Sequence, residues 1–303
     1  MINHVKSTGY YSLDLLRRVV NRVNRFVNNL SPISADPMKS DSEASFYSNT
    51  VDAINLDPKL FQKFRRIYNY REILEHMTYN QGMIYLRKIR ADNPGFKLET
   101  YFPHLNDSIG SPRIFKFEGF KCSPTTIRYL SVALDIKSTF PEGDIKDIVE
   151  IGAGYGGQSS ILQDLLRIEK YVIYDLPNVQ ELIGNYLDSL GKMGCIEFRE
   201  IEDGLETAFD LAISNYAFSE LPKLIQEIYL KTVLSKSKSG YMIMNSGLSD
   251  YTGRSEGKLS LANIRKYLPN SVVVQEKPLT SRDNYILLWG KNLNLTNHEV
   301  INV

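Results

Sequence analysis

The sequence contains little cysteine, since Cys122 and Cys195 are the two such residues in a chain of 303. Two thiols cannot build a disulfide framework or a cysteine-rich metal site, which favours free thiols in a reducing compartment. Runs of 18 apolar residues are absent, so no membrane-spanning helix is expected. A secretory signal is not expected either, because arginines interrupt the apolar residues near the N-terminus. These absences predict a cytoplasmic protein.

An excess of charge of one sign is also lacking. Lysine and arginine number 36 and aspartate and glutamate 35, which leaves a net charge of +1. No overall field would attract nucleic acid or an acidic membrane surface, and we expect no nucleic-acid partner. Hydrophobic residues make up 43% of the chain and charged residues 23%, as in an ordinary globular protein with a sizeable core.

The first 95 residues have a helical pattern. Residues 11–30 place apolar side chains at the spacing of an amphipathic helix, with arginines on the other face. Such a helix could lie on a membrane surface, but packing on the protein itself or on a second subunit is favoured. Residues 31–49 resemble a loop, and residues 57–90 resemble further helices. We expect the region 1–95 to act as a lid, a substrate-binding element or a homodimer surface.

A connecting segment follows over residues 96–143. Its first part reads as turns and one short strand. The stretch "SPTTIRYLSVALDI", residues 123–136, predicts a helix with Ser123 as its N-cap and Pro124 at its first position.

From residue 144 onwards, strand and helix patterns alternate, which is typical of a parallel α/β sheet. The last two strand patterns are separated by a short polar stretch that suits a hairpin. We therefore predict an α/β, Rossmann-like sheet over residues 144–303, mostly parallel, with seven strands and a C-terminal antiparallel hairpin. The strand patterns cover residues 147–151, 170–175, 195–200, 209–215, 240–246, 271–277 and 284–290.

The stretch "DIVEIGAGYGG" predicts a buried strand that enters a glycine-rich turn. Gly152, Gly154 and Gly157 match the dinucleotide pattern G-x-G-x-x-G. Glu150, Gly152, Gly154 and Gly156 match E-x-G-x-G-x-G, which is typical of S-adenosylmethionine sites. In both patterns the backbone must approach a ligand closely, and a Cβ atom would clash there. The glycines alone leave hydride transfer and methyl transfer open.

Two carboxylates help to choose between these readings. Asp175 ends the second strand pattern, where a carboxylate accepts hydrogen bonds from ribose hydroxyls. Glu150 is an acid near the end of a strand that is usually apolar throughout in a dinucleotide site, so such a site explains it poorly. Near the methionine end of S-adenosylmethionine, the same acid could orient the ligand's amino group. A Tyr-x-x-x-Lys dyad is absent from the sequence, which removes one large class of dehydrogenases.

The segments "VEIGAGYGG", "YVIYDLP", "FDLAISNYAFSELP" and "NYILLWG" resemble class I S-adenosylmethionine-dependent methyltransferases. More closely, the chain is similar to a family of sugar O-methyltransferases from bacterial surface-polysaccharide gene clusters. In that family a "GxP" segment and a "TTLRY" helix precede the cofactor loop, and here "IGSPRIF" and "SPTTIRY" hold those places. The resemblance covers roughly residues 98–290 and implies S-adenosylmethionine as the cofactor.

The resemblance also implies roles for individual residues. The glycine turn with Glu150 would hold the methionine side, Asp175 the ribose, and Leu176 the adenine. The adenine amino group would meet Asp203 or Glu202. Side chains at the end of the fourth strand would lie beside the reactive methyl group. The residues expected at the cofactor are Glu150, Gly152, Gly154, Tyr155, Gly156, Asp175, Leu176, Asp203, Ser214, Asn215 and Arg128.

A sugar hydroxyl is a weak nucleophile and benefits from a general base. The candidates are Glu220, in "FSELP", and His104, in the loop "YFPHLNDSIGSP". The family often has a histidine where this chain has Tyr216 or Ala217, so Tyr216 is a third candidate. Arg128 could hold a carboxylate of the cofactor or of an acidic sugar through paired hydrogen bonds. No tight Asp-Asp or His-Asp pair predicts a metal site.

The leading hypothesis is an O-methyltransferase that acts on a sugar or a glycan precursor. Small phenols or other metabolites are alternative acceptors. An NAD(P)-dependent oxidoreductase and a non-catalytic relative of the fold remain as different classes.

Overall fold

The computed structural model describes residues 47–101, 107–140, 143, 145–201, 208–248 and 257–302. All of these residues belong to one contact unit, Pro37–Val303, and a second unit covers Met1–Asp36. The helix predicted over residues 11–30 therefore lies outside the described residues. In the part of the chain that is described, no helix is both long and apolar enough to cross a bilayer.

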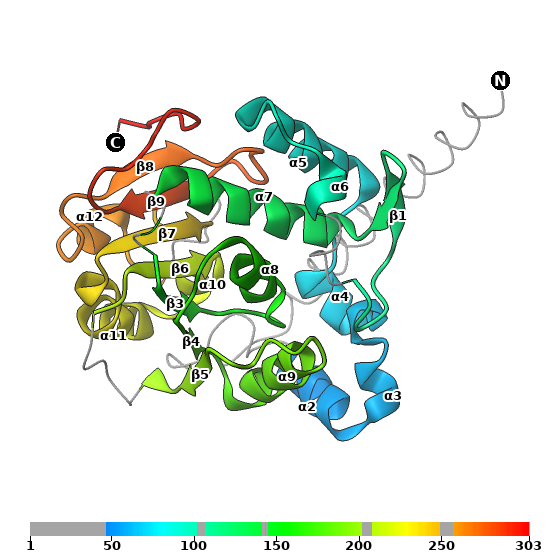
Figure 1. Cartoon of the computed structure of the whole chain (residues 1–303). Coiled ribbons are helices and arrows are strands. Elements are labelled where there is room, and N and C mark those ends of the chain that lie inside the picture. The colour runs from blue at the N-terminus through cyan, green and yellow to red at the C-terminus, as the bar shows by residue number, and fades with distance from the viewer. Residues whose placement is uncertain are drawn as a thin grey trace. The chain divides into compact units, whose positions relative to one another are not determined.

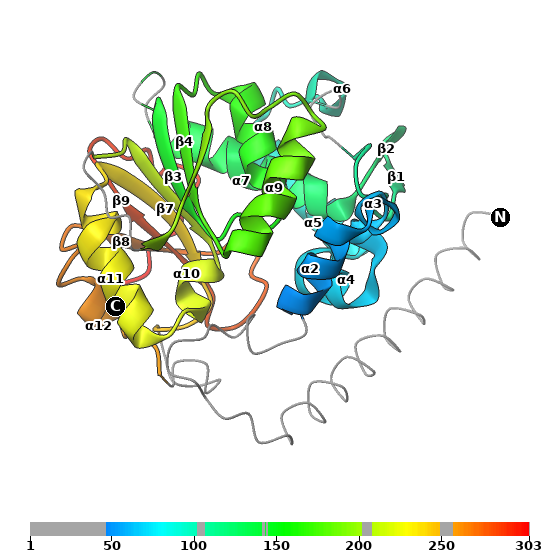
Figure 2. The same ribbon diagram turned by 90° about the horizontal axis from the view of Figure 1, so that it is seen from below.

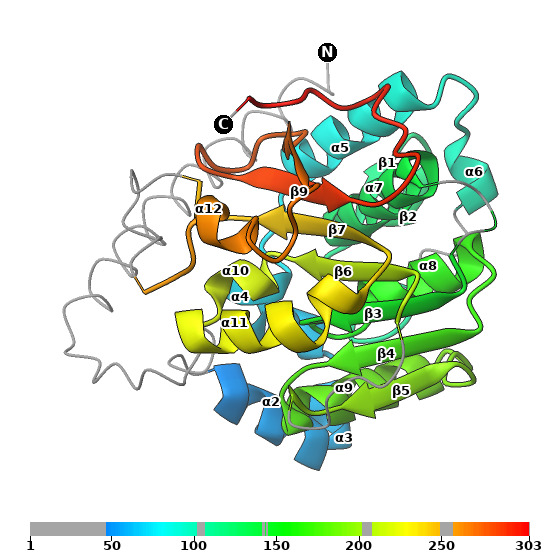
Figure 3. The same cartoon turned by 90° about the vertical axis from the view of Figure 1, so that its left-hand side faces the viewer.

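A mostly parallel sheet forms the centre of the fold (Figure 3). Its seven strands are β3 (Asp147–Ile151), β4 (Lys170–Tyr174), β5 (Ile196–Arg199), β6 (Leu211–Asn215), β7 (Ser239–Met244), β8 (Val272–Gln275) and β9 (Tyr285–Trp289). They lie in the order β5-β4-β3-β6-β7-β9-β8. Strands β3 to β7 run parallel, and β9 is antiparallel to both of its neighbours. This topology confirms the fold class that the alternating pattern predicts.

Each sheet face carries its own apolar core, because successive side chains of a strand point to opposite faces. In β3, Ile148 packs in one core, whereas Val149 and Ile151 pack in the other. Helices α7 (Pro124–Thr139), α8 (Gly157–Leu165) and α9 (Pro177–Asp188) cover the first face (Figure 1). The second face is covered by α10 (Ala217–Glu220), α11 (Lys223–Thr232), the 3-10 turn η4 (Leu234–Lys236) and α12 (Leu261–Ile264).

The helices before the sheet pack on its first layer of helices. They are α2 (Tyr47–Leu56), α3 (Pro58–Phe61), the 3-10 turn η1 (Phe64–Arg66), α4 (Tyr68–Leu74), α5 (Tyr79–Asp92) and α6 (Leu98–Tyr101). Helix α2 lies beside α9 (Figure 2), where Asn178 donates to the Ser48 carbonyl at 3.1 Å and to Asp52 Oδ1 at 2.7 Å. Helix α5 packs along α7. The predicted division of the chain at residues 95 and 143 stays a prediction.

Two local expectations are wrong. The loop predicted up to residue 49 ends earlier, because α2 already begins at Tyr47 and buries Tyr47, Val51 and Ile54 at helical spacing. The connecting segment forms a two-stranded hairpin, β1 (Phe115–Phe117) and β2 (Phe120–Cys122), rather than one short strand. Its turn residues Glu118 and Gly119 both have positive φ, which suits a tight two-residue turn.

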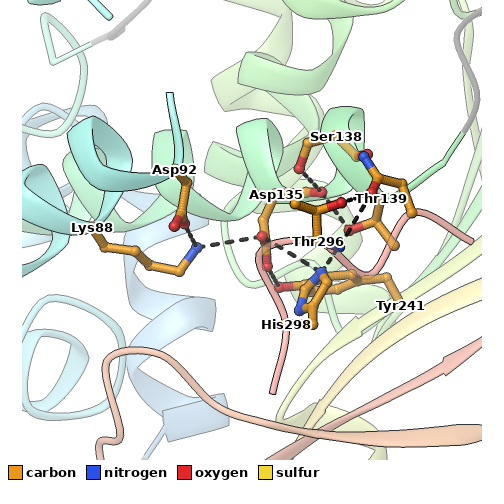
Figure 4. Close-up of polar contacts among 9 residues, drawn as sticks. Lys88, Asp92, Asp135, Ser138, Thr139, Tyr241, Thr296 and His298 are labelled. Carbon is orange, nitrogen blue, oxygen red and sulfur yellow. Dashed lines mark hydrogen bonds and ion pairs between the residues drawn. The ribbon is translucent and has the colours of Figure 1, made fainter. Parts of the chain in front are cut away.

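Helix α7 begins and ends with defined polar contacts. Ser123 caps it by accepting from the Thr125 amide at 3.2 Å, and Pro124 follows, as predicted. Near the other end, Asp135 is 5% exposed and accepts from the Tyr241 hydroxyl at 2.6 Å and from Lys88 Nζ at 3.3 Å. In the same cluster, His298 Nε2 lies 2.8 Å from Thr139 Oγ1 (Figure 4). These contacts fasten the C-terminal segment to α7.

Candidate functional site

The expected site residues converge where the strand order changes direction. Strands β3 and β6 are parallel neighbours, and the chain continues from β3 towards β4 but from β6 towards β7. The carboxyl ends of such a strand pair are where open α/β sheets bind ligands. Seven of the predicted cofactor residues follow or end the strands at this edge. They are Gly152, Gly154, Gly156, Asp175, Leu176, Ser214 and Asn215.

The turn after β3 requires its glycines. Gly152, Gly154 and Gly156 have φ angles of +74°, +66° and +86°, a region in which residues with a Cβ are strained. A Cβ on Gly152 would lie 2.1 Å from the Cβ of Ala217, and one on Gly154 would lie 3.4 Å from Leu74. The turn therefore brings the starts of α8 and α10 and the end of α4 together. The contact with Leu74 was not predictable, because it joins two distant segments.

Glu150 is buried rather than exposed, with 1% of its surface accessible. Its Oε2 accepts from the Tyr171 hydroxyl at 2.7 Å. Burial raises the pKa of Glu150 to about 8, the hydrogen bond from Tyr171 lowers it in part, and the charge of Asp175 adds to the rise. The acid two residues before the glycine turn is thus largely protonated at neutral pH and would ionise beside a cationic ligand.

Asp175 and Leu176 lie between the end of β4 and the start of α9. Asp175 Oδ1 accepts from the Leu176 amide at 2.9 Å, and Gln180 donates to the Asp175 carbonyl at 2.9 Å. Tyr47, on α2, is close by: burial raises its pKa, and the charge of Asp175 raises it further. Sequence patterns gave no signal for Tyr47, because α2 itself was not expected.

At the end of β6, the polar side chain of Ser214 is fully bonded within the described residues, whereas that of Asn215 is not. Ser214 Oγ donates to the Ile151 carbonyl at 2.9 Å and accepts from the Phe218 amide at 3.0 Å, so its hydroxyl joins β6 to β3 and α10. Asn215 Oδ1 is buried and has no hydrogen-bond partner in the described part of the chain. A buried amide oxygen without a donor is costly, and a ligand N–H group would satisfy it.

Tyr216 follows directly and has an unusual backbone. Its φ of +72° is rare for a residue with a Cβ and is typical of functional sites. Its amide donates to the Ile243 carbonyl at 2.7 Å, which fixes this conformation. Its hydroxyl donates to the carboxylate of Glu276, a residue that sequence reasoning missed.

Arg128 lies on α7 beside this tyrosine. Its guanidinium carbon is 5.2 Å from the ring centre of Tyr129 and 6.0 Å from that of Tyr216. Burial opposes the charge of Arg128, but Tyr129, Tyr216 and Tyr85 outweigh it and raise its pKa. No carboxylate of the described residues forms an ion pair with this half-buried arginine. The structure thus leaves a positive charge available for a ligand.

Tyr155 does not present its ring to the ligand side. It is 1% exposed and packs edge-to-face against Tyr129 and Tyr186. The guanidinium carbon of Arg65 lies 4.9 Å from its ring centre. The role predicted for the Tyr155 side chain at the cofactor is therefore replaced by a role in the core, and its backbone alone belongs to the glycine turn.

Arg65 also ties the early helices to this turn. It forms ion pairs with Glu75 and, at 2.9 Å, with Asp107. Asp107 in turn accepts from the Ser123 amide at 2.6 Å, at the start of α7. A buried arginine with two acids positions η1, α4 and α7 around Tyr155, and sequence spacing did not reveal it.

Of the predicted bases Glu220 and His104, the structure describes Glu220 alone. Glu220 ends α10, where its Oε1 accepts from Asn245 Nδ2 at 2.9 Å and its carbonyl accepts from Lys258. His104, Glu202 and Asp203 lie outside the described residues. Among the described residues, no group of three or more histidine, cysteine, aspartate or glutamate side chains could hold a metal ion.

Comparison with known proteins gives matches at the level of structure. No family model and no curated protein matches the chain. The chain is similar to the methyltransferase domain of bacterial CtHen1, with 12% identity and a TM-score of 0.42 over 54% of this chain and 97% of that chain. It is also similar to a SAM-dependent methyltransferase from Aquifex aeolicus, with 16% identity and a TM-score of 0.38 over 53% of this chain and 87% of that chain.

A third structure is NcsB1, an O-methyltransferase from neocarzinostatin biosynthesis, solved with S-adenosyl-L-homocysteine and 1,4-dihydroxy-2-naphthoic acid. Its identity is 14% and its TM-score 0.38, over 55% of this chain and 58% of that chain. Similarity at these levels does not by itself establish a shared function.

Proposed function

We propose that this protein is an S-adenosylmethionine-dependent O-methyltransferase that methylates a hydroxyl group of a sugar or glycan precursor. The observation that carries the proposal is the arrangement around the glycine turn at the change of strand direction. There, Glu150 precedes the turn, Asp175 follows the end of the neighbouring strand β4, and Asn215, whose amide oxygen is buried without a partner among the described residues, ends the strand β6. A dinucleotide site explains neither Glu150 nor Asn215.

The residues present fit the cofactor group by group. Asp175 would accept hydrogen bonds from the ribose hydroxyls, and Leu176 would pack on the adenine. Asn215 Oδ1 would accept from the amino group of the methionine end, which removes its unsatisfied state. Arg128 would bind the carboxylate at that end, since it has a charge and no acid of its own. Glu150 would ionise and balance the ligand's positive charges.

When bound, S-adenosylmethionine supplies an electrophilic methyl group on a good leaving group. The protein's task is then to align the acceptor oxygen and to remove its proton. Tyr216 and Glu220 stand at the end of β6 and on α10, next to the expected methyl group, and both can accept hydrogen bonds from an acceptor hydroxyl. His104 stays a further candidate base. No metal ion is needed in this scheme.

The sugar acceptor is supported by the resemblance of "IGSPRIF" and "SPTTIRY" to the sugar O-methyltransferase family. The second segment begins α7, so it places Arg128 beside Tyr216. A role of the N-terminal helices as a lid is supported by the contact of Leu74 with the glycine turn. Homodimer formation through residues 1–95 stays a prediction.

Titration calorimetry tests the cofactor assignment. We expect the protein to bind S-adenosylhomocysteine and not NADH, and Asp175→Ala to weaken binding of S-adenosylhomocysteine at least tenfold because the ribose loses its acceptor. Asp188→Ala is the matched control, since Asp188 is an exposed carboxylate at the far end of α9. Binding of NADH alone, or full affinity in Asp175→Ala, would contradict the assignment.

A transfer assay tests the acceptor. Cofactor labelled in its methyl group is incubated with nucleotide sugars and, in parallel, with catechol. Label on a nucleotide sugar supports the sugar assignment, whereas label on catechol alone would move the function to phenols.

A further inference from the structure

The last hairpin brings a buried carboxylate to the same sheet edge as Tyr216. Tyr285, at the start of β9, pairs with Met244 on one side and with Gln275 on the other. The ends of β7 and β8 therefore flank the start of β9, and Glu276 follows the end of β8 directly. This position depends on the hairpin register and could not be read from the sequence.

Glu276 is held as a hydrogen-bond acceptor. It is 3% exposed, and its Oε2 accepts from the Thr280 amide at 2.8 Å. The Thr280 hydroxyl lies 3.0 Å from Oε1, and Asn284 donates to that hydroxyl at 2.7 Å. The Tyr216 hydroxyl donates to Oε1. Among the described residues, no lysine or arginine forms an ion pair with Glu276, so its charge is available to take up a proton.

The positive charge of Arg128 also acts on Tyr216. Burial raises the pKa of Tyr216 and of Tyr85, and the charge of Glu276 adds to both rises. The positive charge of Arg128 lowers both pKa values in part. The groups that face the pair are thus Arg128 from α7, Tyr85 from α5 and Tyr241 from β7. The Tyr216 hydroxyl therefore keeps its proton at rest and donates it in a hydrogen bond to Glu276.

We propose that Tyr216 and Glu276 form a proton relay for methyl transfer to the acceptor. The acceptor hydroxyl gives its proton to the Tyr216 oxygen, while the Tyr216 proton passes to the carboxylate of Glu276. The acceptor oxygen forms its bond to the methyl carbon, the bond from carbon to sulfur breaks, and Glu276 is left protonated until solvent removes that proton. Tyr216 is the catalytic residue in this step, and Glu276 is a positioning residue that acts through it.

This inference rests on the proposed function and replaces Glu220 as the base. Glu220 is bonded through its side chain to Asn245, on the α10 side of the sheet. Tyr216 instead projects from the end of β6 in a constrained backbone conformation, with Arg128 at its ring. The bond to Glu276 could also serve merely to hold the hairpin on β6, and the two roles predict different kinetics.

The test compares Glu276→Gln with the wild type. The glutamine oxygen can still accept from Tyr216, although its amide nitrogen cannot accept from the Thr280 amide, and the relay has no final proton acceptor. We expect kcat for transfer from labelled cofactor to nucleotide sugars to fall about 10²–10⁴-fold. KM and the affinity for S-adenosylhomocysteine should change less than threefold, whereas a loss of the hairpin structure would change all three. Tyr216→Phe should lose the same factor in kcat.

Glu299→Gln is the matched control, because Glu299 is an exposed glutamate paired with Lys277 near the same hairpin. Carbon-13 NMR of labelled tyrosine provides a second measurement that needs no acceptor: the Tyr216 ring resonance should differ between the wild type and Glu276→Gln, because the carboxylate that accepts from its hydroxyl is replaced by an amide. Unchanged kcat in Glu276→Gln, or a Tyr216 resonance that is the same in the wild type and in Glu276→Gln, would overturn the relay. Failure of the wild type to bind S-adenosylhomocysteine would instead overturn the proposed function.

Discussion

Glu150 shows how one buried acid couples folding stability to pH. The folded protein holds its proton up to about pH 8, whereas the unfolded chain releases it near pH 4.5. Between these values the folded state binds more protons than the unfolded state, so this group contributes less and less stability as pH rises. Such a cost is expected where a charge is needed only when the ligand is present.

Glu150→Gln should therefore remove this pH dependence. Relative to the wild type, we expect the variant to gain stability steadily between pH 5 and pH 8.5, by on the order of a few kcal/mol at the upper end. Urea unfolding at several pH values measures this, with Glu99→Gln, an exposed glutamate on α6, as the control. A stability difference between variant and wild type that does not change with pH would contradict the raised pKa.

At the scale of elements, the sequence predicts the sheet well and the contacts between distant elements poorly. Each central strand is a short apolar run with a turn signal, and β3 begins and ends where the pattern places it. The helix α2 was missed because a serine-rich flank hides its three buried positions. Glu276 was missed because its nearness to Tyr216 depends on the pairing of β7, β9 and β8, which no local pattern encodes.

The C-terminal segment gives a second pH test at this scale. Burial lowers the pKa of His298, and this effect outweighs the opposite effect of Asp135. The unfolded chain, with a histidine pKa near 6.5, then binds the proton more readily than the folded protein. The contribution of His298 is complete above about pH 6.5 and is lost as pH falls below it. The contact between Thr139 of α7 and His298 of the C-terminal segment should therefore weaken in acid.

His298→Gln should therefore differ from the wild type most at pH 7.5 and progressively less towards pH 5.5. Thermal unfolding across this range measures the difference. His76→Gln, at an exposed position before α5, is the control. A difference that grows in acid would show that His298 is protonated in the folded protein.

At the scale of the whole described unit, the helices before the sheet lie next to the candidate site. Leu74 leaves room for no more than a Cβ at Gly154, the charge of Asp175 acts on Tyr47, and Arg65 packs on the ring of Tyr155. We therefore expect a ligand at this edge to contact α2 and α4. By linkage, whatever loosens these helices should weaken the ligand, and the ligand should stabilise the helices.

Asn178 allows this coupling to be tested from outside the site, because its side chain fastens α9 to Ser48 and Asp52 of α2. Asn178→Ala should loosen α2 and weaken binding of S-adenosylhomocysteine by about 3–10-fold, a coupling of about 1 kcal/mol. In the wild type, the ligand should slow amide hydrogen exchange in α2 and α4 but not in β8. Asn185→Ala, an exposed position on the same helix, is the control. Unchanged affinity in Asn178→Ala, together with unchanged exchange in α2, would mean that the helices cover the site without responding to it.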